Sequence, residues 1–188
     1  MTFFEIKKIF WVLRALWYKP FMGCIGGRSY LGKPVSILGK KRIFFEDNVH
    51  IYPGARIEVY GNGKLIIGSG VSISQNVHIV VTKDTLKIGK NTLIGPNVYI
   101  ANSDHGFNDV SKRIVDRDLT YRKTEIGENC FIGFGSAILP GTILKGNDIV
   151  GANSVLNTGY DKNLLIVGQP GKIKKAYKTE LKRWEKIK

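Results

Sequence analysis

Aliphatic residues recur at every sixth position between residues 124 and 158. The members of this series are Ile126, Ile132, Ile138, Leu144, Val150 and Leu156, and three of them are followed directly by glycine. A period of six fits neither the 3.6-residue period of a helix nor the alternation of a hairpin, and a short repeat of this length is typical of a solenoid. Each hexad therefore predicts one short strand and one corner.

Three hexads predict one triangular coil, in which residues eighteen positions apart stack on each other. The expected pairs are Ile126 with Leu144, Ile132 with Val150, and Ile138 with Leu156. Stacked coils pair as parallel strands about 4.8 Å apart and bury their aliphatic columns along the axis. Glycine, asparagine and aspartate between the hexads supply the tight and left-handed backbone that corners need.

A weaker form of the repeat extends back to Pro34. Its expected inward residues are Phe45, Ile51, Ile57, Ile67, Ile73, Ile79, Ile88, Ile94 and Ile100. Between residues 101 and 123 the repeat is lost, and a polar excursion of this length is usually functional. We expect an all-β solenoid over residues 34–158 with one long protruding loop, a leading segment of residues 1–33, and a trailing segment of residues 159–188.

Both ends of the chain are predicted to be helical. Residues 2–18 carry apolar side chains at helical spacing, but this run is too short to span a bilayer and no signal-peptide cleavage site follows it. Two interpretations stay open: a helix that caps the solenoid, or a basic amphipathic helix on the cytoplasmic face of a membrane. A short basic helix is expected from about Ala176.

Composition limits the class of protein and its partners. With 188 residues, 43% of them apolar, the chain can form a single domain with a real core. A formal net charge of +14 suits an anionic partner, but no nucleic-acid-binding fold is visible, so we expect no nucleic acid partner. Cys24 and Cys130 make no disulfide framework, which favours a reducing, cytoplasmic location.

The hexads and the stretch from Gly95 to His105 resemble the hexapeptide-repeat, left-handed parallel β-helix acyltransferases, over about residues 65–175. The left-handed coil follows from this resemblance, because crossovers are otherwise right-handed. In galactoside and maltose acetyltransferases, which the stretch resembles, a histidine at this position is followed by proline. Here Gly106 and Phe107 follow, and the pair Asp104-His105 is more similar to acetyltransferases of capsule and O-antigen clusters. The resemblance therefore implies a sugar or glycan acceptor.

The implied reaction is transfer of acetyl from acetyl-CoA to a sugar hydroxyl, with His105 as the catalytic base. A thioester is already activated, and an imidazole that takes the hydroxyl proton typically contributes about 10²–10⁴-fold. No covalent acyl-enzyme is required. Solenoids of this shape also include zinc carbonic anhydrases, but the close histidine pair of those enzymes is absent, so no metal is expected. His50 and His78 each precede an inward isoleucine and should point outward.

The resemblance also implies binding residues. Asn76 falls where sugar enzymes bind the acceptor, or is an ordinary corner residue; Asp104 orients His105, binds the acceptor, or stabilises the turn. For CoA the implied residues are Phe131, Gly133, Ala152, Asn157, Thr158, Lys172 and Lys175. Among these, Gly133 is expected to donate its N–H to the oxyanion, Asn157-Thr158 stands where Thr-Lys is common, and the two lysines match phosphate-binding positions.

Deep sites in the resembling family form between subunits of a cyclic trimer, so a homotrimer is expected. Two other functions stay open. The first is N-acetylation of a nucleotide-linked amino sugar, and the second is a non-catalytic β-helix scaffold.

Overall fold

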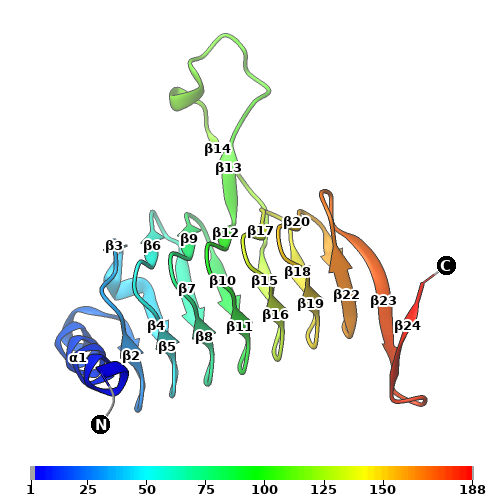
Figure 1. Ribbon diagram of the computed structural model, residues 1–188. Helices are drawn as coiled ribbons and strands as arrows, with labels where there is room; N and C mark the ends of the chain where they lie inside the picture. Colours follow the sequence, from blue (N-terminus) through cyan, green and yellow to red (C-terminus); the bar gives the residue numbers. More distant parts are fainter. Residues whose placement is uncertain (1–2, 188) are drawn as a thin grey trace.

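The computed structural model describes residues 3–187, so Met1, Lys188 and the first residue of the expected N-terminal helix, Thr2, lie outside the described part. The chain forms a three-sided solenoid with a helix, α1 (Phe3–Tyr18), at its N-terminal end (Figure 1). Short 3-10 helices η1 (Lys19–Phe21) and η2 (Lys40–Arg42) follow in the first coils. The solenoid is the architecture that the hexads predict.

Three parallel sheets form the three sides. Sheet A contains β1 (Cys24–Ile25), β4 (Ile43–Phe45), β7 (Lys64–Ile67), β10 (Thr85–Ile88), β15 (Glu125–Ile126), β18 (Ile143–Leu144) and β21 (Gly159–Tyr160). Sheet B contains β2 (Tyr30–Leu31), β5 (His50–Ile51), β8 (Ser72–Ile73), β11 (Leu93–Ile94), β16 (Phe131–Ile132), β19 (Ile149–Val150) and β22 (Leu164–Val167), followed by the antiparallel strands β23 (Lys172–Lys178) and β24 (Arg183–Lys186). Sheet C contains β3 (Ser36–Leu38), β6 (Arg56–Val59), β9 (His78–Val81), β12 (Tyr99–Ala101), β17 (Ala137–Ile138) and β20 (Val155–Leu156). These strands make six complete coils and part of a seventh.

The core is three columns of aliphatic side chains, one behind each sheet. The predicted stacking is confirmed: the paired residues are Ile126 with Leu144, Ile132 with Val150, and Ile138 with Leu156. Ile88 pairs with Ile126, although 38 positions separate them. The solenoid therefore continues without a gap across the excursion. The left-handed sense of the coils stays a prediction from the resemblance.

The excursion leaves the solenoid between β12 and β15 and projects from its side as the predicted protruding loop (Figure 1). It has structure of its own, because β13 (Ser103–His105) pairs in antiparallel fashion with β14 (Leu119–Tyr121). A short 3-10 helix, η3 (Ile114–Asp116), lies near the tip. We call residues 102–122 the ribbon.

The prediction of a C-terminal helix is wrong. Residues 172–178 form β23, which pairs with β22, and β24 pairs with β23. The last coil leaves the backbone of β22 unpaired on one side, and this edge favours strand pairing over the local helical preference. The rings of Tyr177 and Trp184, whose centroids are 5.5 Å apart, pack together across the two added strands.

Helix α1 lies against the first coil. Ala15 is buried, the Arg14 Nη1 donates to the Leu31 carbonyl at 3.1 Å, and the Trp11 ring packs against Tyr30 with centroids 5.7 Å apart. The apolar side chains at helical spacing in residues 2–18 form a stripe along the helix. Its members are Ile6, whose side chain lies outside the described part, and Ile9, Phe10, Leu13, Leu16 and Trp17, which are all exposed. The side of α1 that packs against the first coil is therefore not the side that carries the apolar stripe.

Asp148 is a buried carboxylate in a corner of the sixth coil. Its Oδ1 accepts from the Leu164 N–H at 2.9 Å, and its Oδ2 accepts from the Gly146 N–H at 3.1 Å. Burial raises the pKa of Asp148 to about 6, although the two N–H donors act in the opposite direction. Between about pH 4 and pH 6 the folded protein therefore holds a proton that the unfolded chain has lost.

We expect Asp148→Asn to remove this pH dependence. As the pH falls from 7 to about 4, the wild type should gain up to about 3 kcal/mol of unfolding free energy relative to the variant, because protonation favours its folded state. Urea unfolding of both proteins at several pH values measures the difference. An identical pH dependence in the two proteins would contradict the raised pKa.

Candidate active site

The ribbon is held at its base by two buried polar side chains. The Asn102 Oδ1 accepts from the Thr82 N–H at 3.0 Å, and its Nδ2 donates to the Lys83 carbonyl at 2.6 Å. The Thr124 Oγ1 donates to the Arg122 carbonyl and accepts from the Gly141 N–H, each at 3.1 Å. The base of the ribbon is thus tied to the coils before and after it, which fixes the direction in which it projects.

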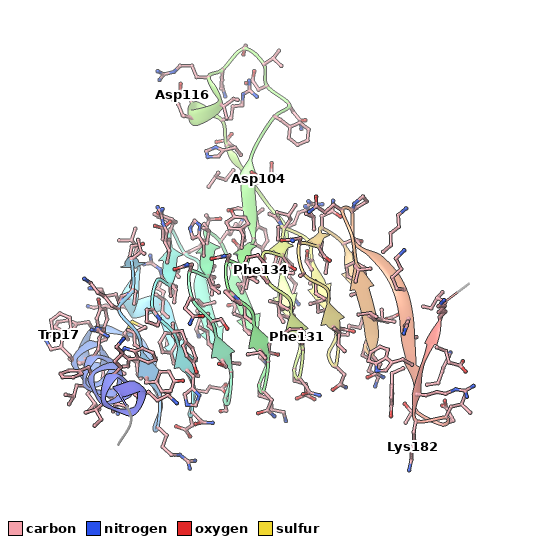
Figure 2. All side chains as sticks on the ribbon, in the orientation of Figure 1. Trp17, Asp104, Asp116, Phe131, Phe134 and Lys182 are labelled. Atoms are coloured by element: carbon pink, nitrogen blue, oxygen red, sulfur yellow. The ribbon has the colours of Figure 1, made fainter. Side chains whose placement is uncertain are left out.

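Asp104 and His105 lie on β13, near the point where the ribbon leaves the solenoid (Figure 2). Both side chains are exposed, and both line a pocket of about 500 Å³. The remaining lining residues are Tyr60, Val80, Thr82, Tyr99, Ser103, Val115, Arg117 and Leu119. The pocket therefore lies between the ribbon and sheet C.

The Asp104 carboxylate contacts the backbone of His105 and not its ring. Its Oδ1 accepts from the His105 main-chain N–H at 2.8 Å. Of the three roles that the sequence leaves open for Asp104, this contact supports stabilisation of the local turn. Tyr99 is half-buried and lies near Asp104. Burial raises the pKa of its phenol, and the charges of Asp104 and Glu58 raise that pKa further.

A cluster of polar side chains on sheet C adjoins this pocket. The Glu58 Oε1 accepts from the Arg56 Nε at 2.6 Å and from the Ser36 Oγ at 3.2 Å, and the Glu58 Oε2 lies 3.5 Å from the His78 Nε2. Burial raises the pKa of Glu58, but these hydrogen bonds and the charge of Arg56 outweigh it, so the net shift is downward. The His78 ring packs edge-on against Tyr99, with centroids 5.4 Å apart.

His50 and His78 both point outward, as the alternation predicts, but neither is a freely exposed imidazole. His78 is half-buried beside Glu58, and His50 stacks on Tyr30 with centroids 4.2 Å apart. Sequence reasoning missed the Glu58 cluster. The available signal was the acidic residue that directly follows the inward Ile57 and is flanked by Val59 on its other side.

The residues implied for CoA binding lie apart from His105 within one chain. Phe131 lies on sheet B, away from Asp104 (Figure 2). It lines a second pocket of about 590 Å³ with Tyr177 and Trp184. Gly133 and Ala152 stack at the corner between sheets B and C, where a Cβ on Gly133 would lie 2.6 Å from the Ala152 nitrogen. None of these residues lines the His105 pocket.

The prediction that the Gly133 N–H serves the oxyanion is wrong for this conformation. That N–H donates to the Val150 carbonyl at 2.8 Å, as part of the pairing between coils. The Ala152 N–H, by contrast, donates to no carbonyl or side chain of residues 3–187. A free backbone donor at this corner suits the contact with the pantetheine arm that the resemblance implies for Ala152.

The other predicted binding residues lie at three further places. Asn76 is an exposed corner residue with φ +58°, and its Oδ1 lies over Gly54 of the preceding coil. Asn157 and Thr158 are exposed at the corner that follows β20. Lys172 and Lys175 both lie on β23. The left-handed backbone supports a corner role for Asn76, and its role toward an acceptor stays a prediction.

The Cys130 thiol is not placed as an activated nucleophile. Burial raises the pKa of the Cys130 thiol to about 11, so it is protonated at neutral pH, and Cys24 is a free, exposed thiol. Within the described residues no group of three or more His, Cys, Asp and Glu side chains is arranged to hold a metal ion. Across the same residues, no helix combines the length and the apolar character needed to cross a bilayer.

Comparison with known proteins bears on the family. Residues 123–158 match the family model described as the hexapeptide repeat of succinyl-transferase. The Escherichia coli (strain K12) protein named "Putative lipopolysaccharide biosynthesis O-acetyl transferase WbbJ" is 32% identical over 160 residues, which are 81% of this chain and 81% of that protein. The chain belongs to the hexapeptide-repeat acyltransferase family.

Solved structures share the fold of this acyltransferase. The N-acyltransferase AntD from Bacillus cereus, in complex with dTDP and 3-hydroxybutyryl-CoA, has a TM-score of 0.74 at 20% identity and covers 85% of this chain and 86% of its own. A galactoside acetyltransferase in complex with coenzyme A has a TM-score of 0.62 at 22% identity, and the match covers 93% of this chain and 77% of that protein's chain. Both of these proteins bind a CoA species, and at these identities their likeness to this acyltransferase concerns the fold.

We expect Asn102→Ala to loosen the ribbon, because it leaves the Thr82 N–H and the Lys83 carbonyl without their partner. The loss should cost about 1–3 kcal/mol of unfolding free energy and speed amide hydrogen exchange in residues 103–121. Asn108→Ala, an exposed position in the same ribbon, is the matched control and should change neither. Equal exchange rates in the two variants would show that Asn102 does not hold the ribbon.

Proposed function

We propose that this acyltransferase transfers acetyl from acetyl-CoA to a hydroxyl group of a sugar unit during the assembly of a surface polysaccharide, a capsule or an O-antigen. The observation that carries the proposal is the placement of His105 on a fixed ribbon, where it lines a pocket with Asp104 and Tyr99. The similarity to the WbbJ protein supports the choice of a glycan acceptor.

In this mechanism, the His105 imidazole accepts the proton of the acceptor hydroxyl as the oxygen attacks the thioester carbonyl. The carbon–sulfur bond then breaks, and the proton passes from His105 to the departing CoA thiolate. One ester forms, one thioester is lost, and atoms and charge balance. Cys130 takes no part, because its protonated, buried thiol is a poor nucleophile.

The acceptor occupies the space between the ribbon and sheet C. Asp104 has one carboxylate oxygen engaged with the His105 backbone, and its other oxygen is available to accept from a sugar hydroxyl. The rings of Tyr60 and Tyr99 offer amphipathic surfaces for the faces of a sugar, each with a phenol that can make hydrogen bonds.

A second copy of the chain completes the donor site. His105 and the corner that carries Ala152 lie apart in one chain, and the ribbon projects away from its own coils. In a cyclic trimer the ribbon of one subunit reaches the corner of the next, as in the resembling enzymes. Lys172 and Lys175 on β23 then meet the CoA phosphates, and Phe131, Asn157 and Thr158 contact other parts of CoA. The two free cysteines fit a reducing, cytoplasmic location for this reaction.

A nucleotide-linked amino sugar is the second candidate acceptor. The structural likeness to AntD, an N-acyltransferase solved with dTDP, favours it. An unprotonated amine is already a good nucleophile and depends less on a base. The strength of the requirement for His105 therefore distinguishes the two acceptors.

We expect His105→Ala to lower kcat for transfer to a sugar hydroxyl by about 10²–10⁴-fold, because the general base is lost. Binding should persist, so CoA at a hundredfold excess over its Kd should still stabilise the variant by about 2.7 kcal/mol. Radiolabelled acetyl-CoA with a panel of hydroxyl and amine acceptors measures transfer, and thermal unfolding measures binding.

His50→Ala is the matched control, because His50 stacks on Tyr30 on sheet B and is not among the residues that line the pocket. It should keep its kcat. Retained activity in His105→Ala would remove His105 from the role of base. Transfer to amines alone would contradict O-acetylation, and no transfer together with no stabilisation by CoA would favour the scaffold interpretation.

We further expect two inactive variants to restore activity when they assemble together. His105→Ala disables the ribbon, and Ala152→Trp blocks the donor corner. If each site combines the ribbon of one subunit with the corner of the next, a mixed trimer has one intact site, or about a third of wild-type activity. The test is tandem purification of the two co-expressed variants under different tags, followed by the transfer assay.

Light scattering of the wild type should give three copies of the 21.0 kDa chain, about 63 kDa. Inactive mixed trimers would show that each site lies within one chain. Full activity of Ala152→Trp alone would show that this corner does not hold the donor, and a monomeric wild type would contradict the shared site.

A further inference from the structure

The side of α1 that faces away from the solenoid is apolar and exposed. The exposed fractions are 48% for Ile9, 60% for Phe10, 54% for Leu13, 57% for Leu16 and 65% for Trp17. Trp17 is seen at the outer edge of the helix, on the side away from the coils (Figure 2). Contiguous apolar patches of this kind are uncommon on soluble monomers and mark a surface that binds something.

This face is structurally separate from the contact that holds the helix in place. Ala15, Trp11 and Arg14 contact the first coil, and helical geometry puts Leu13 and Trp17 on the opposite side of the helix axis from Ala15. The Trp17 ring also packs on Phe21 of η1, with centroids 5.7 Å apart, which extends the face beyond the end of α1. The contacts that hold α1 on the solenoid therefore leave its apolar face exposed and available to bind a partner.

Basic residues border the face. Lys7 is exposed on α1, Lys19 and Lys41 are exposed near its C-terminal end, and the Lys40 Nζ lies 5.2 Å from the centre of the Tyr18 ring. The sequence of α1 contains a single acidic residue, Glu5. An apolar stripe of leucine and aromatic residues with lysine along its borders is the pattern of a helix that lies in the plane of an anionic membrane surface.

We infer that α1 docks this protein on an anionic phospholipid surface, with Phe10, Leu13 and Trp17 inserted among the acyl chains and the bordering lysines at the headgroups. A second copy of the chain is a poorer occupant. Pairing of two such helices would bring the basic borders of both copies, with Lys19 and Lys41, close together. The inference is independent of the reaction that the chain catalyses.

The test is co-sedimentation of the full chain with vesicles. The wild type should bind vesicles of phosphatidylcholine with phosphatidylglycerol, and should bind vesicles of phosphatidylcholine alone much more weakly. The double variant Leu13→Gln and Trp17→Gln should bind the anionic vesicles at least about tenfold less well, because it loses the inserted apolar area. Leu181→Gln is the matched control, since Leu181 has the same exposed fraction of 54% at the other end of the molecule.

A charge variant gives a second readout that does not alter the apolar face. Lys19→Glu with Lys41→Glu should weaken binding to anionic vesicles by about fivefold or more per residue, and added salt should weaken binding of the wild type. Thermal unfolding should be unchanged in the charge variant and in Leu181→Gln, whose substituted side chains are exposed, and should change little in the apolar double variant, which loses only the contacts of the Trp17 ring with Tyr18 and Phe21. If the double variant fails to fold, the charge variant still tests the inference.

Three outcomes would overturn the inference. The first is a wild type that stays in the supernatant with anionic vesicles. The second is equal binding by the wild type, the apolar double variant and the charge variant. The third is a change in the mass measured by light scattering for the apolar double variant with vesicle binding unchanged, which would assign the face to a second copy.

Discussion

The structure depends on the stacking of aliphatic side chains in three columns. Each coil gains stability only when its inward residues lie directly over those of the coil below, because both the buried contacts and the parallel hydrogen bonds require this register. Variation is therefore confined to the corners, where extra chain can leave and return without shifting a strand. Ile88 and Ile126 pair in the same parallel register as residues eighteen apart do elsewhere.

This constraint explains how the candidate site is built. A long excursion can carry reactive side chains because its two ends emerge at one corner, and Asn102 and Thr124 tie those ends to neighbouring coils. The rigid part of the molecule is then the platform, formed by sheet C with Tyr99 and Glu58, and the ribbon adds Asp104 and His105 above it. Neither part alone makes the pocket.

Much of the fold could be predicted from the sequence because the period of six is a direct consequence of the geometry of the coil. The excursion was visible as the loss of that period, and His105 stood out within it. The C-terminal helix was wrong because local spacing does not reveal an unpaired strand edge, here that of β22. The sequence of one repeat does not show which backbone N–H groups donate to carbonyls of the next coil. This is why the Gly133 N–H was assigned to the oxyanion, although it donates to the Val150 carbonyl. Asn102 and the Glu58 cluster were missed because Thr82, which Asn102 contacts, and Ser36 and His78, which Glu58 contacts, lie about 20 residues away along the chain.

The two ends of the solenoid are closed in different ways, and this has a consequence for how the protein behaves at high concentration. A stack of parallel strands could in principle grow by adding the first coil of one molecule to the last coil of another. Helix α1 lies over the first coil, while β23 reverses direction on the last one and turns its edge into an antiparallel pair with β24. On sheet B, therefore, neither end presents an uncovered parallel strand, which disfavours the end-to-end growth of fibres through this sheet.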